Sequence, residues 1–389
     1  MAKSGAQIDG AALSKLTASI QHDVETGLYD GAVIAMAHRG EVVLDEAIGY
    51  SERDAGRIAK TDDVFRILSL SKAFTVATVF QAIEDGLLSL TTRVVDVIPE
   101  FRSQDRFLNK RKDRISLYHL LTHRSAMPPT PEPLPTLELG DLSRVIARIC
   151  ELDAIGEPGD VIDYSPAINH ALMAEMVRRV RGEEHFRTVV TRGIFEPLGM
   201  SSTAMGAPAR LADRIVPIKA RFADAGWLSG KDIEDLNITV DEDAELPWVG
   251  YVSSAGDVLR FAEMYRRGGE LDGARIVHPA ILQRAFQNQT GDLLNNWWIP
   301  MWQRRNWAPM PANLGIGVFL RGTGMHPSIL GTLTSPGTFG NYGAGSTLYW
   351  VDPERELTFV ALTAGVLEES ANIERFQRLS DLAVSTVIA

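Results

Sequence analysis

A serine and a lysine three residues apart are the first candidates for chemistry in this sequence. Ser69 and Lys72 lie in the run ILSLSKAFT at 67–75, which is otherwise apolar or hydroxyl-bearing. Side chains at positions i and i+3 share one face of a helix, so the two can touch if a helix begins at Ser69. Burial would lower the lysine pKa from its free value of roughly 10.4, and the neutral amine could then take the serine proton. The spacing therefore predicts a nucleophile with its base one helical turn away.

A second interpretation of this pair is structural. Only one of the eight lysines, Lys72, has a serine three places before it, but the spacing also arises by chance in many proteins. A lysine at a helix start often extends its charged end to solvent along an apolar stem. If the helix does begin at Ser69, its first backbone N–H groups can also stabilise an oxyanion there. Other parts of the sequence are needed to distinguish a catalytic Lys72 from a lysine whose charged end lies in solvent.

The hydrophobic pattern predicts the elements that position this pair. Residues 9–26 predict an amphipathic helix, and the runs GAVIAMAH and EVVLDEAIGY, joined at Arg39-Gly40, predict a hairpin. GSTLYWVDP and ELTFVALTAG predict two strands around Asp352-Pro353, followed by a last helix at about 372–387. Further helices are expected at 69–85, 113–123, 142–152, 169–182 and after Ser254, where Asp257 completes a capping-box pattern. Strands at both ends around a helical middle predict one α/β (α+β) sheet lobe from 1–68 and 216–389, and a helical lobe at 69–215, with the active site between them.

Composition and charge limit the classes of function. The chain has 389 residues, 45% hydrophobic and 23% charged, with a formal net charge of −11. That charge, without a basic tract, argues against nucleic acid or an anionic membrane as a partner. The N-terminus has no apolar secretory stretch and no run of about 18 apolar residues follows, so we expect a cytoplasmic protein. A processed mature chain with a restored Met is the alternative. The single cysteine, Cys150, is expected to be a buried small hydrophobe.

Motifs for other chemistries are missing from the sequence. It contains no H-E-x-x-H, Walker A, G-x-G-x-x-G or G-x-S-x-G pattern. We therefore expect no metal and no cofactor. A small molecule is expected as the partner of a monomer or homodimer, and the resemblance described below implies that it is an ester. His123, in LLTHRS, is expected to be structural, because a serine with a lysine base needs no histidine.

The segment 64–101 closely resembles the active-site region of the serine β-lactamase-like superfamily, in its class C β-lactamase and family VIII carboxylesterase branch. The shared pattern is an F-R-I-x-S-x-x-K core, a helix, Gly, Leu-x-Leu and a later Pro-Glu. Further blocks follow in family order at 115–127, 157–177, 195–205, 250–261 and 339–363. The resemblance implies a β-lactamase/transpeptidase-like fold, with an antiparallel sheet flanked by terminal helices and an inserted, mostly helical lobe.

The resemblance also implies roles for single residues. Ser69 would be the nucleophile, Lys72 its partner, and Tyr164, in DYSPA, the second general base. A lysine ammonium favours a nearby phenolate, so the Lys–Tyr pair can share a proton, and its resting protonation is open. The pair would accept the serine proton on acylation, protonate the leaving group and activate water for deacylation. A core aromatic at a helix entry is the alternative for Tyr164.

The block FGNYGAGST matches the family strand that carries Lys-Thr-Gly or His-x-Gly. Asn341, Tyr342 and Gly343 take those places, and Gly343 would let the strand approach substrate closely. The backbone N–H groups of Ala344 and Ser69 would form the oxyanion hole. Two departures from the family matter: Pro166 replaces the asparagine of Tyr-x-Asn, and Asn341 replaces the cationic or His residue. Because a neutral amide cannot hold a substrate carboxylate through a charge-assisted contact, both favour uncharged esters over penicillin-type substrates.

A tryptophan-rich segment lies at 295–307, NNWWIPMWQRRNW, and contains four of the seven tryptophans of the chain. It does not resemble a regular helix or strand. Trp297, Trp298 and Trp302 could line a hydrophobic substrate pocket on a loop or flap. A surface loop held to the core by its aromatics and a dimer contact are the alternatives. Arg304 and Arg305 could supply a contact to a carboxylate, but a solvated pair is the expectation.

The leading hypothesis is a serine carboxylesterase that cleaves hydrophobic esters through an acyl-enzyme. An acyltransferase on the same fold is the first alternative, because a dry, Trp-lined pocket favours an acceptor other than water. An amidase, D-peptidase or β-lactamase is the next, and Asn341 and Pro166 argue against it. A catalytically idle binding protein is the last, and the presence of serine, lysine and tyrosine together argues against that.

Overall fold

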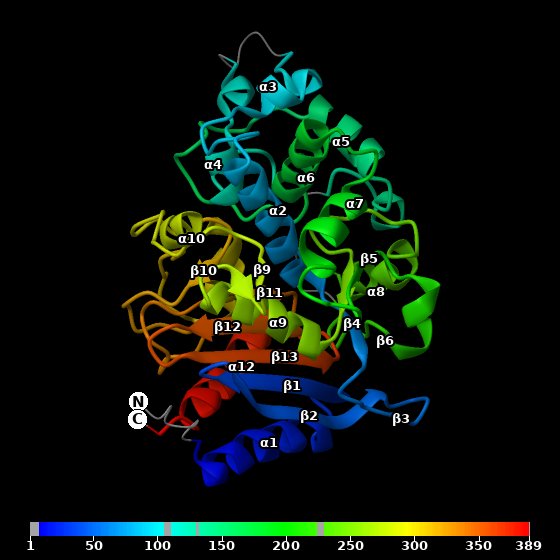
Figure 1. Cartoon of the computed structure of the whole chain (residues 1–389), viewed down its shortest axis with the longest axis vertical. Coiled ribbons are helices and arrows are strands. Elements are labelled where there is room, and N and C mark those ends of the chain that lie inside the picture. Colours follow the sequence, from blue (N-terminus) through cyan, green and yellow to red (C-terminus); the bar gives the residue numbers. More distant parts are fainter. Residues whose placement is uncertain (1–7, 105–109, 130–131, 224–228, 389) are drawn as a thin grey trace.

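Figure 1 shows the computed structural model of the chain, in which residues 8–104, 110–129, 132–223 and 229–388 are described. The helices are α1 Gly10–Glu25, α2 Lys72–Glu84, α3 Val94–Val97, α4 Leu117–Leu121, α5 Leu142–Glu151, α6 Ile168–Arg181, α7 Phe186–Val190, α8 Gly230–Thr239, α9 Ala255–Arg266, α10 Pro279–Ala285, α11 Ile299–Arg305 and α12 Glu369–Val384. The strands are β1 Gly31–His38, β2 Glu41–Glu52, β3 Arg57–Ile58, β4 Val64–Arg66, β5 Ala204–Met205, β6 Ile215–Val216, β7 Tyr251–Ser253, β8 Glu270–Leu271, β9 Ala274–Arg275, β10 Phe319–Leu320, β11 Phe339–Gly343, β12 Thr347–Asp352 and β13 Leu357–Ala364.

A seven-stranded sheet, in the order β10-β11-β12-β13-β1-β2-β3, forms one half of the molecule. All its neighbouring strands run antiparallel, and β1 joins the two ends of the chain by pairing with both β2 and β13. In Figure 1 the blue strands β1 and β2 therefore lie beside the orange and red strands β12 and β13. The predicted hairpin and the two predicted C-terminal strands are confirmed.

Both faces of this sheet are covered, because successive residues of a strand point to opposite sides. On β1, Ile34 and Met36 belong to the core beneath α1 and α12, whereas Val33 and Ala35 belong to the core on the side of α9. Terminal helices thus cover one face and an internal helix covers the other. This arrangement fixes the strand β11, which passes the site described below.

The other half is mostly helical and is built around α2. Ten of the first eleven residues of this helix are buried, and α6 packs along it. A helix that is apolar on all sides has to be surrounded by protein. A small sheet, in the order β5-β7-β4-β6, lies where the two halves meet and leads from β4 directly into the residues before α2.

The predicted fold class is confirmed, and four details differ from the sequence expectations. Helix α12 begins at Glu369 rather than about 372, and part of the tryptophan-rich segment is helical as α11, so the expectation of no regular structure there is wrong. Cys150 is half-buried rather than buried. Ser254 caps α9, but the Asp257 carboxylate accepts hydrogen bonds from Ser202 and Thr203 instead of completing a capping box. The lobe boundaries at residues 68 and 216 stay a prediction.

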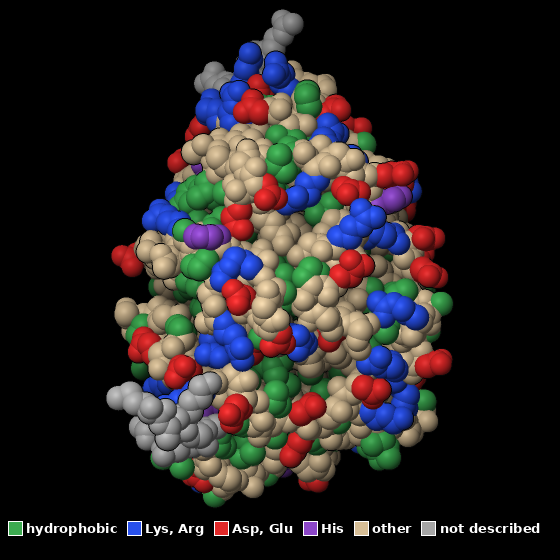
Figure 2. Space-filling model, in the orientation of Figure 1, with side chains coloured by type: hydrophobic (Ala, Val, Ile, Leu, Met, Phe, Trp, Pro, Cys, Tyr) green, Lys and Arg blue, Asp and Glu red, His purple; other side chains and the backbone are tan. Residues whose placement is uncertain are grey.

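Surface charge is mixed on the face shown in Figure 2, where basic and acidic side chains lie beside one another. No helix among the described residues combines the length and apolar character needed to cross a membrane.

Candidate active site

Ser69 lies in a tight turn that leads into the buried helix α2. The turn is a 3-10 helix, Leu68–Ser71, and Lys72 is the first residue of α2. Leu68 has a φ of 50°, a left-handed conformation that is strained for a side chain with a Cβ and that tends to occur at functional sites. Lys72 Nζ donates to Ser69 Oγ over 2.9 Å and to the Trp248 carbonyl oxygen over 3.2 Å. The predicted contact between serine and lysine is therefore present.

Strand β11 holds this turn from behind, and Gly343 makes the approach possible. A Cβ on Gly343 would lie 2.3 Å from the Ile67 carbonyl oxygen and 2.4 Å from Thr347 Oγ1. Thr347 Oγ1 donates to the same Ile67 carbonyl over 2.7 Å. The glycine thus lets the strand approach the turn before the nucleophile, and the predicted close approach of the strand to substrate stays a prediction.

Burial controls the protonation of Lys72, which is only 4% exposed. Burial lowers the pKa of its amine to about 7, although the nearby carboxyl of Glu132 acts in the opposite direction. Burial also raises the pKa of the Tyr164 phenol above its ordinary value, against the effect of a hydrogen bond with Ser69. Above pH 7 this places a neutral amine and a neutral phenol beside the serine, rather than an ammonium and a phenolate.

Tyr164 is held by rings on two sides. The His123 ring stacks on it with 4.6 Å between centroids, and the Trp297 ring lies 5.4 Å away. His123 Nδ1 accepts a hydrogen bond from the Ser165 N–H over 3.0 Å. Burial, with a smaller contribution from the charge of Lys72, lowers the His123 pKa to about 3, so this ring stays neutral at ordinary pH. His123 therefore has a structural role, because its ring positions Tyr164.

Ser69 and Tyr164 open onto one large cleft with a volume of about 1060 Å³. The residues that line it include Leu68, Ser69, Glu132, Leu134, Tyr164, Pro166, Ile233, Leu236, Trp248, Trp297, Tyr342, Ala344 and Glu369. The cleft walls therefore come from the helical half, from α8 and from the end of strand β11.

A family model described as beta-lactamase matches residues 16–383. This chain belongs to the beta-lactamase family. "Protein Rv1367c" of Mycobacterium tuberculosis (strain ATCC 25618 / H37Rv) is 26% identical over 372 residues, covering 89% of this chain and 88% of its own length. The beta-lactamase family and its serine-hydrolase fold are thus assigned across nearly the whole chain.

Two solved structures share the fold of this beta-lactamase family member. "EstCE1, a hydrolase with promiscuous acyltransferase activity" superposes with a TM-score of 0.76 at 20% identity, covering 95% of this chain and 98% of its own. A "family VIII carboxylesterase" superposes with a TM-score of 0.76 at 19% identity, covering 98% and 99%. At this level of identity the comparison shows the fold alone.

Some of the predicted binding residues line the cleft of this beta-lactamase family member. Tyr342, Trp297 and Ala344 line it, as does Pro166. Asn341 does not: successive residues of β11 alternate sides, and its amide donates to the Gly317 carbonyl over 3.2 Å behind the strand. Asn341 therefore does not line the cleft, and its predicted contact with substrate stays a prediction.

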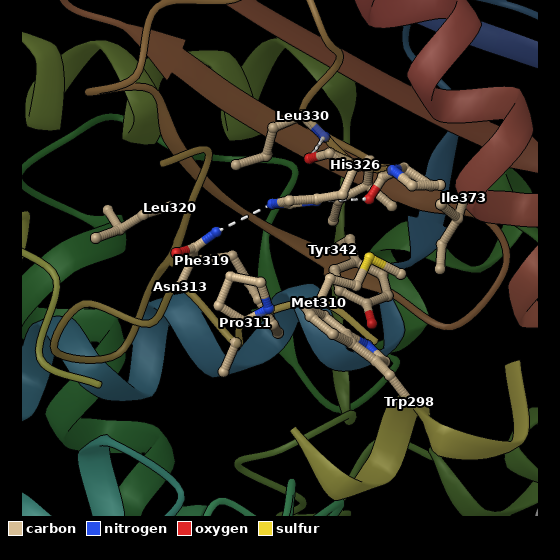
Figure 3. Close-up of a pocket in the computed structure, with 14 residues that line it drawn as sticks. Trp298, Met310, Pro311, Asn313, Phe319, Leu320, His326, Leu330, Tyr342 and Ile373 are labelled. Atoms are coloured by element: carbon tan, nitrogen blue, oxygen red, sulfur yellow. Dashed lines mark hydrogen bonds between the residues drawn. The ribbon is translucent and has the colours of Figure 1, made fainter. Parts of the chain in front are cut away.

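Trp298 and Trp302 lie away from Ser69. Trp302 is 5% exposed and does not line the cleft. Trp298 lines a separate side pocket, shown in Figure 3, which shares Tyr342 with the cleft and contains the rings of Phe319 and His326. Its volume is about 30 Å³, enough for roughly one or two water molecules but not for an acyl chain. Arg304 and Arg305 form ion pairs with Glu368 and Glu374 instead of standing free in solvent.

Among the cleft residues that the sequence did not predict, three carry polar groups or contacts that bear on the chemistry, namely Glu132, Trp248 and Glu369. Trp248 supplies the second acceptor for Lys72, and the two glutamates place carboxyl groups in the cleft wall. None lies in a motif that the sequence analysis used. A partial signal exists for Glu369, because it follows directly on Glu368 at the start of a helix, where acids are favoured.

Replacing Gly343 with alanine should destabilise the protein and weaken catalysis together. The new Cβ would overlap the Ile67 carbonyl, so either the strand or the turn before Ser69 must shift. Overpacking of this kind costs typically about 1–3 kcal/mol of unfolding free energy. Chemical denaturation measures the loss, and Gly256→Ala, where a Cβ meets no atom within 4 Å, is the matched control. Equal stability of the two variants would contradict the predicted clash.

Proposed function

We propose that this protein is a serine carboxylesterase that cleaves esters with hydrophobic groups through an acyl-enzyme on Ser69. The observation that carries the proposal is the 2.9 Å contact between Lys72 Nζ and Ser69 Oγ at a lysine whose pKa is about 7. A general base is most effective when its pKa lies near the working pH. A buried lysine with that pKa contributes little to stability, because burial destabilises its charged form. The same pKa suits a general base.

The proposed reaction follows from these contacts. Neutral Lys72 takes the proton of Ser69 as Oγ attacks the ester carbonyl, and the backbone N–H groups of Ser69 and Ala344 bind the oxyanion. The phenol of Tyr164 protonates the departing alkoxide as the bond between the carbonyl carbon and the alcohol oxygen breaks. Lys72 then passes the proton that it took from Ser69 to Tyr164. Water then attacks the acyl-enzyme, and its proton passes through Tyr164 and Lys72 to Ser69 Oγ. This step releases the acid and restores Ser69.

The cleft favours esters over penicillin-type substrates. Leu134, Ile233, Leu236 and Trp248 supply apolar wall, and Asn341 points away from it. Lys231, a cation among the described residues that line the cleft, already pairs with Asp235. A substrate carboxylate would therefore lack the charge-assisted contact it needs. The neighbouring family VIII carboxylesterase structure is consistent with an ester substrate.

Intact-mass analysis tests the proposal directly. Wild-type protein is exposed briefly to p-nitrophenyl esters from acetate to octanoate, and the mass of each acyl group is sought on the protein. We expect an adduct and p-nitrophenol release with at least one chain length. Failure of every ester to acylate or turn over, and of a fluorophosphonate to label Ser69, would falsify the esterase proposal.

Replacing Tyr164 with phenylalanine should slow both formation and hydrolysis of the adduct. The ring and its stacking on His123 are kept, whereas the hydroxyl that reaches Ser69 is lost. Loss of a general acid–base group typically costs about 10²–10⁴-fold in rate. Stopped-flow release of p-nitrophenol measures acylation, and mass spectra over time measure deacylation. Unchanged rates in both steps would remove Tyr164 from the mechanism.

Acyl transfer is a second candidate for the same site. It is favoured by the Trp297 ring beside Tyr164, which shields the acyl-enzyme from water, and by the fold shared with EstCE1, a hydrolase described as having promiscuous acyltransferase activity. Product analysis with added alcohols and amines distinguishes the two. Transfer is supported if ester or amide products rise with acceptor concentration while acid release falls.

A further inference from the structure

Two carboxyl groups that the proposed mechanism does not use face the cleft. Glu369, the first residue of α12, lines the same cavity as Ser69 and is only 5% exposed. Its Oε1 atom is buried and has no hydrogen-bond partner within the described part of the chain. Glu132 lines the cleft as well and lies near enough to Lys72 to influence its charge. A buried acceptor oxygen without a partner is rare, and its position in the cleft wall indicates that a bound ligand could be the partner.

No ion pair with a described residue neutralises Glu369, although the charge of Arg375 acts to lower the pKa of its carboxyl. Its carboxyl interacts with the Tyr342 hydroxyl and with the backbone at Gly345. The buried cation nearest in sequence, Arg375, directs its guanidinium to Thr363 Oγ1, the Gly345 carbonyl and Asn372 Oδ1, and it makes no ion pair with Glu369 among the described contacts. The neighbouring Glu368 pairs with Arg304 and adds negative charge.

The carboxylates at the rim of the cleft, unlike those of Glu369 and Glu132, have ion-pair partners on the protein. Glu138 pairs with Arg144 over 2.6 Å, and Asp235 pairs with Lys231. These outer carboxylates are neutralised by partners on the protein, whereas the two inner ones form no ion pair with a described residue. A charged carboxylate buried without a partner is costly. Accordingly, burial raises the pKa of Glu132 and of Glu369 to about 7.

We propose that the ester substrate carries a protonated amine or another cationic nitrogen, and that Glu369, together with Glu132, binds it. This inference rests on the proposed esterase function and narrows its substrate class. A ligand cation supplies the missing partner of Glu369 and keeps both carboxyls ionised. A substrate anion would meet two like charges in the same wall. The apolar walls still bind the rest of the ester.

The position of Glu369 also limits where the nitrogen lies. Its carboxyl contacts the backbone at Gly345, directly after Ala344, the proposed oxyanion donor. Neighbouring backbone groups are separated by about one Cα–Cα step of 3.8 Å. The cationic nitrogen therefore belongs within a few bonds of the scissile carbonyl, on the acyl or the alcohol side.

Matched pairs of esters test this inference. β-Alanine benzyl ester is compared with benzyl butanoate, in which a methyl group replaces the ammonium. Benzoylcholine is compared with 3,3-dimethylbutyl benzoate, in which carbon replaces the quaternary nitrogen. We expect kcat/KM for the cationic ester to exceed that for its neutral partner by at least about tenfold in one pair, because opposite charges attract strongly in a site shielded from water. A ratio near or below one in both pairs overturns the inference and leaves the esterase proposal standing.

Variants assign the selectivity to these residues. In Glu369→Gln the ratio of cationic to neutral kcat/KM should fall about tenfold or more, and Glu132→Gln should lower it in the same direction. Glu138→Gln on the rim is the matched control, because its carboxylate already has Arg144, and its ratio should stay within about twofold. A ratio unchanged in both inner variants would overturn the assignment. Thermal melts show whether each variant is folded, and Glu132→Gln serves if Glu369→Gln is not.

A binding measurement separates failure of this inference from failure of the esterase proposal. Calorimetric titration of Ser69→Ala with benzylammonium and with benzyl alcohol needs no turnover. Tighter binding of the ammonium by about tenfold, lost in Ser69→Ala/Glu369→Gln, supports the cation site even if no ester is cleaved. Equal binding of the two ligands counts against the site.

Discussion

Replacing Ser69 with alanine is expected to lower kcat for ester hydrolysis by about 10⁴–10⁶-fold, the range seen when an acyl-forming nucleophile is removed. Without Oγ no acyl-enzyme can form, and Lys72 loses the group from which it takes a proton. Steady-state hydrolysis of the best p-nitrophenyl ester measures the loss. Intact mass of the same samples should show no adduct on the variant.

Ser71→Ala is the matched control for this experiment. Ser71 belongs to the same turn and is fully buried, but its hydroxyl accepts from the Tyr251 N–H and does not contact Lys72. We expect it to retain turnover within about tenfold while losing about 1 kcal/mol of stability, the usual value of one hydrogen bond. If Ser69→Ala kept comparable turnover, another group would have to be the nucleophile.

Replacing Lys72 with methionine is expected to lower the acylation rate by about 10²–10⁴-fold and to remove its pH dependence near neutrality. The active form of Lys72 is the neutral amine, whose pKa is about 7. In the wild type, kcat/KM should therefore rise as the pH increases through about 7 and then level off. The variant should lack that rising limb. A profile measured from pH 5 to 9 with a neutral ester checks both statements.

Stability shows whether Lys72→Met fails for catalytic reasons. The pKa of the folded lysine, about 7, lies below its unfolded value of 10.5, so the folded state binds fewer protons between those limits. The buried lysine therefore costs most stability at and below pH 7, and the cost falls as the pH rises toward 10.5. Methionine removes that cost, and the variant should melt no lower than wild type at pH 6. A large loss of stability there would assign the lost activity to the fold.

The parts of the fold that follow from local pattern were predictable from the sequence. The hairpin of β1 and β2 follows from two β-rich runs around Arg39-Gly40, and the contact between Ser69 and Lys72 follows from a spacing of three residues. Both depend on neighbours in sequence. Tyr164 reached the same cleft only through the resemblance to a family, because 92 residues separate it from Lys72.

Features set by side-chain direction and distant packing were not predictable in this way. Asn341 was expected at the substrate, but its place on β11 turns it toward Gly317, and one residue of register decides the face. Helix α11 was missed because Trp302 and Pro300 have lower helix propensity than alanine or leucine, yet the core around Met301 and Trp302 buries it. Glu369 carries no motif, and only the packing of α12 against the sheet and α11 brings it to the cleft.

The contact of Gly343 and Thr347 with the Ile67 carbonyl has a consequence for how this protein can change. It ties the nucleophile and the proposed oxyanion donor to the sheet half, while much of the wall facing the ester comes from residues 132–139 and α8. Substitutions, insertions or deletions in those wall segments alter the shape offered to the ester without moving Ser69 relative to Ala344. Libraries for laboratory evolution of new substrate ranges therefore belong at 132–139 and on α8.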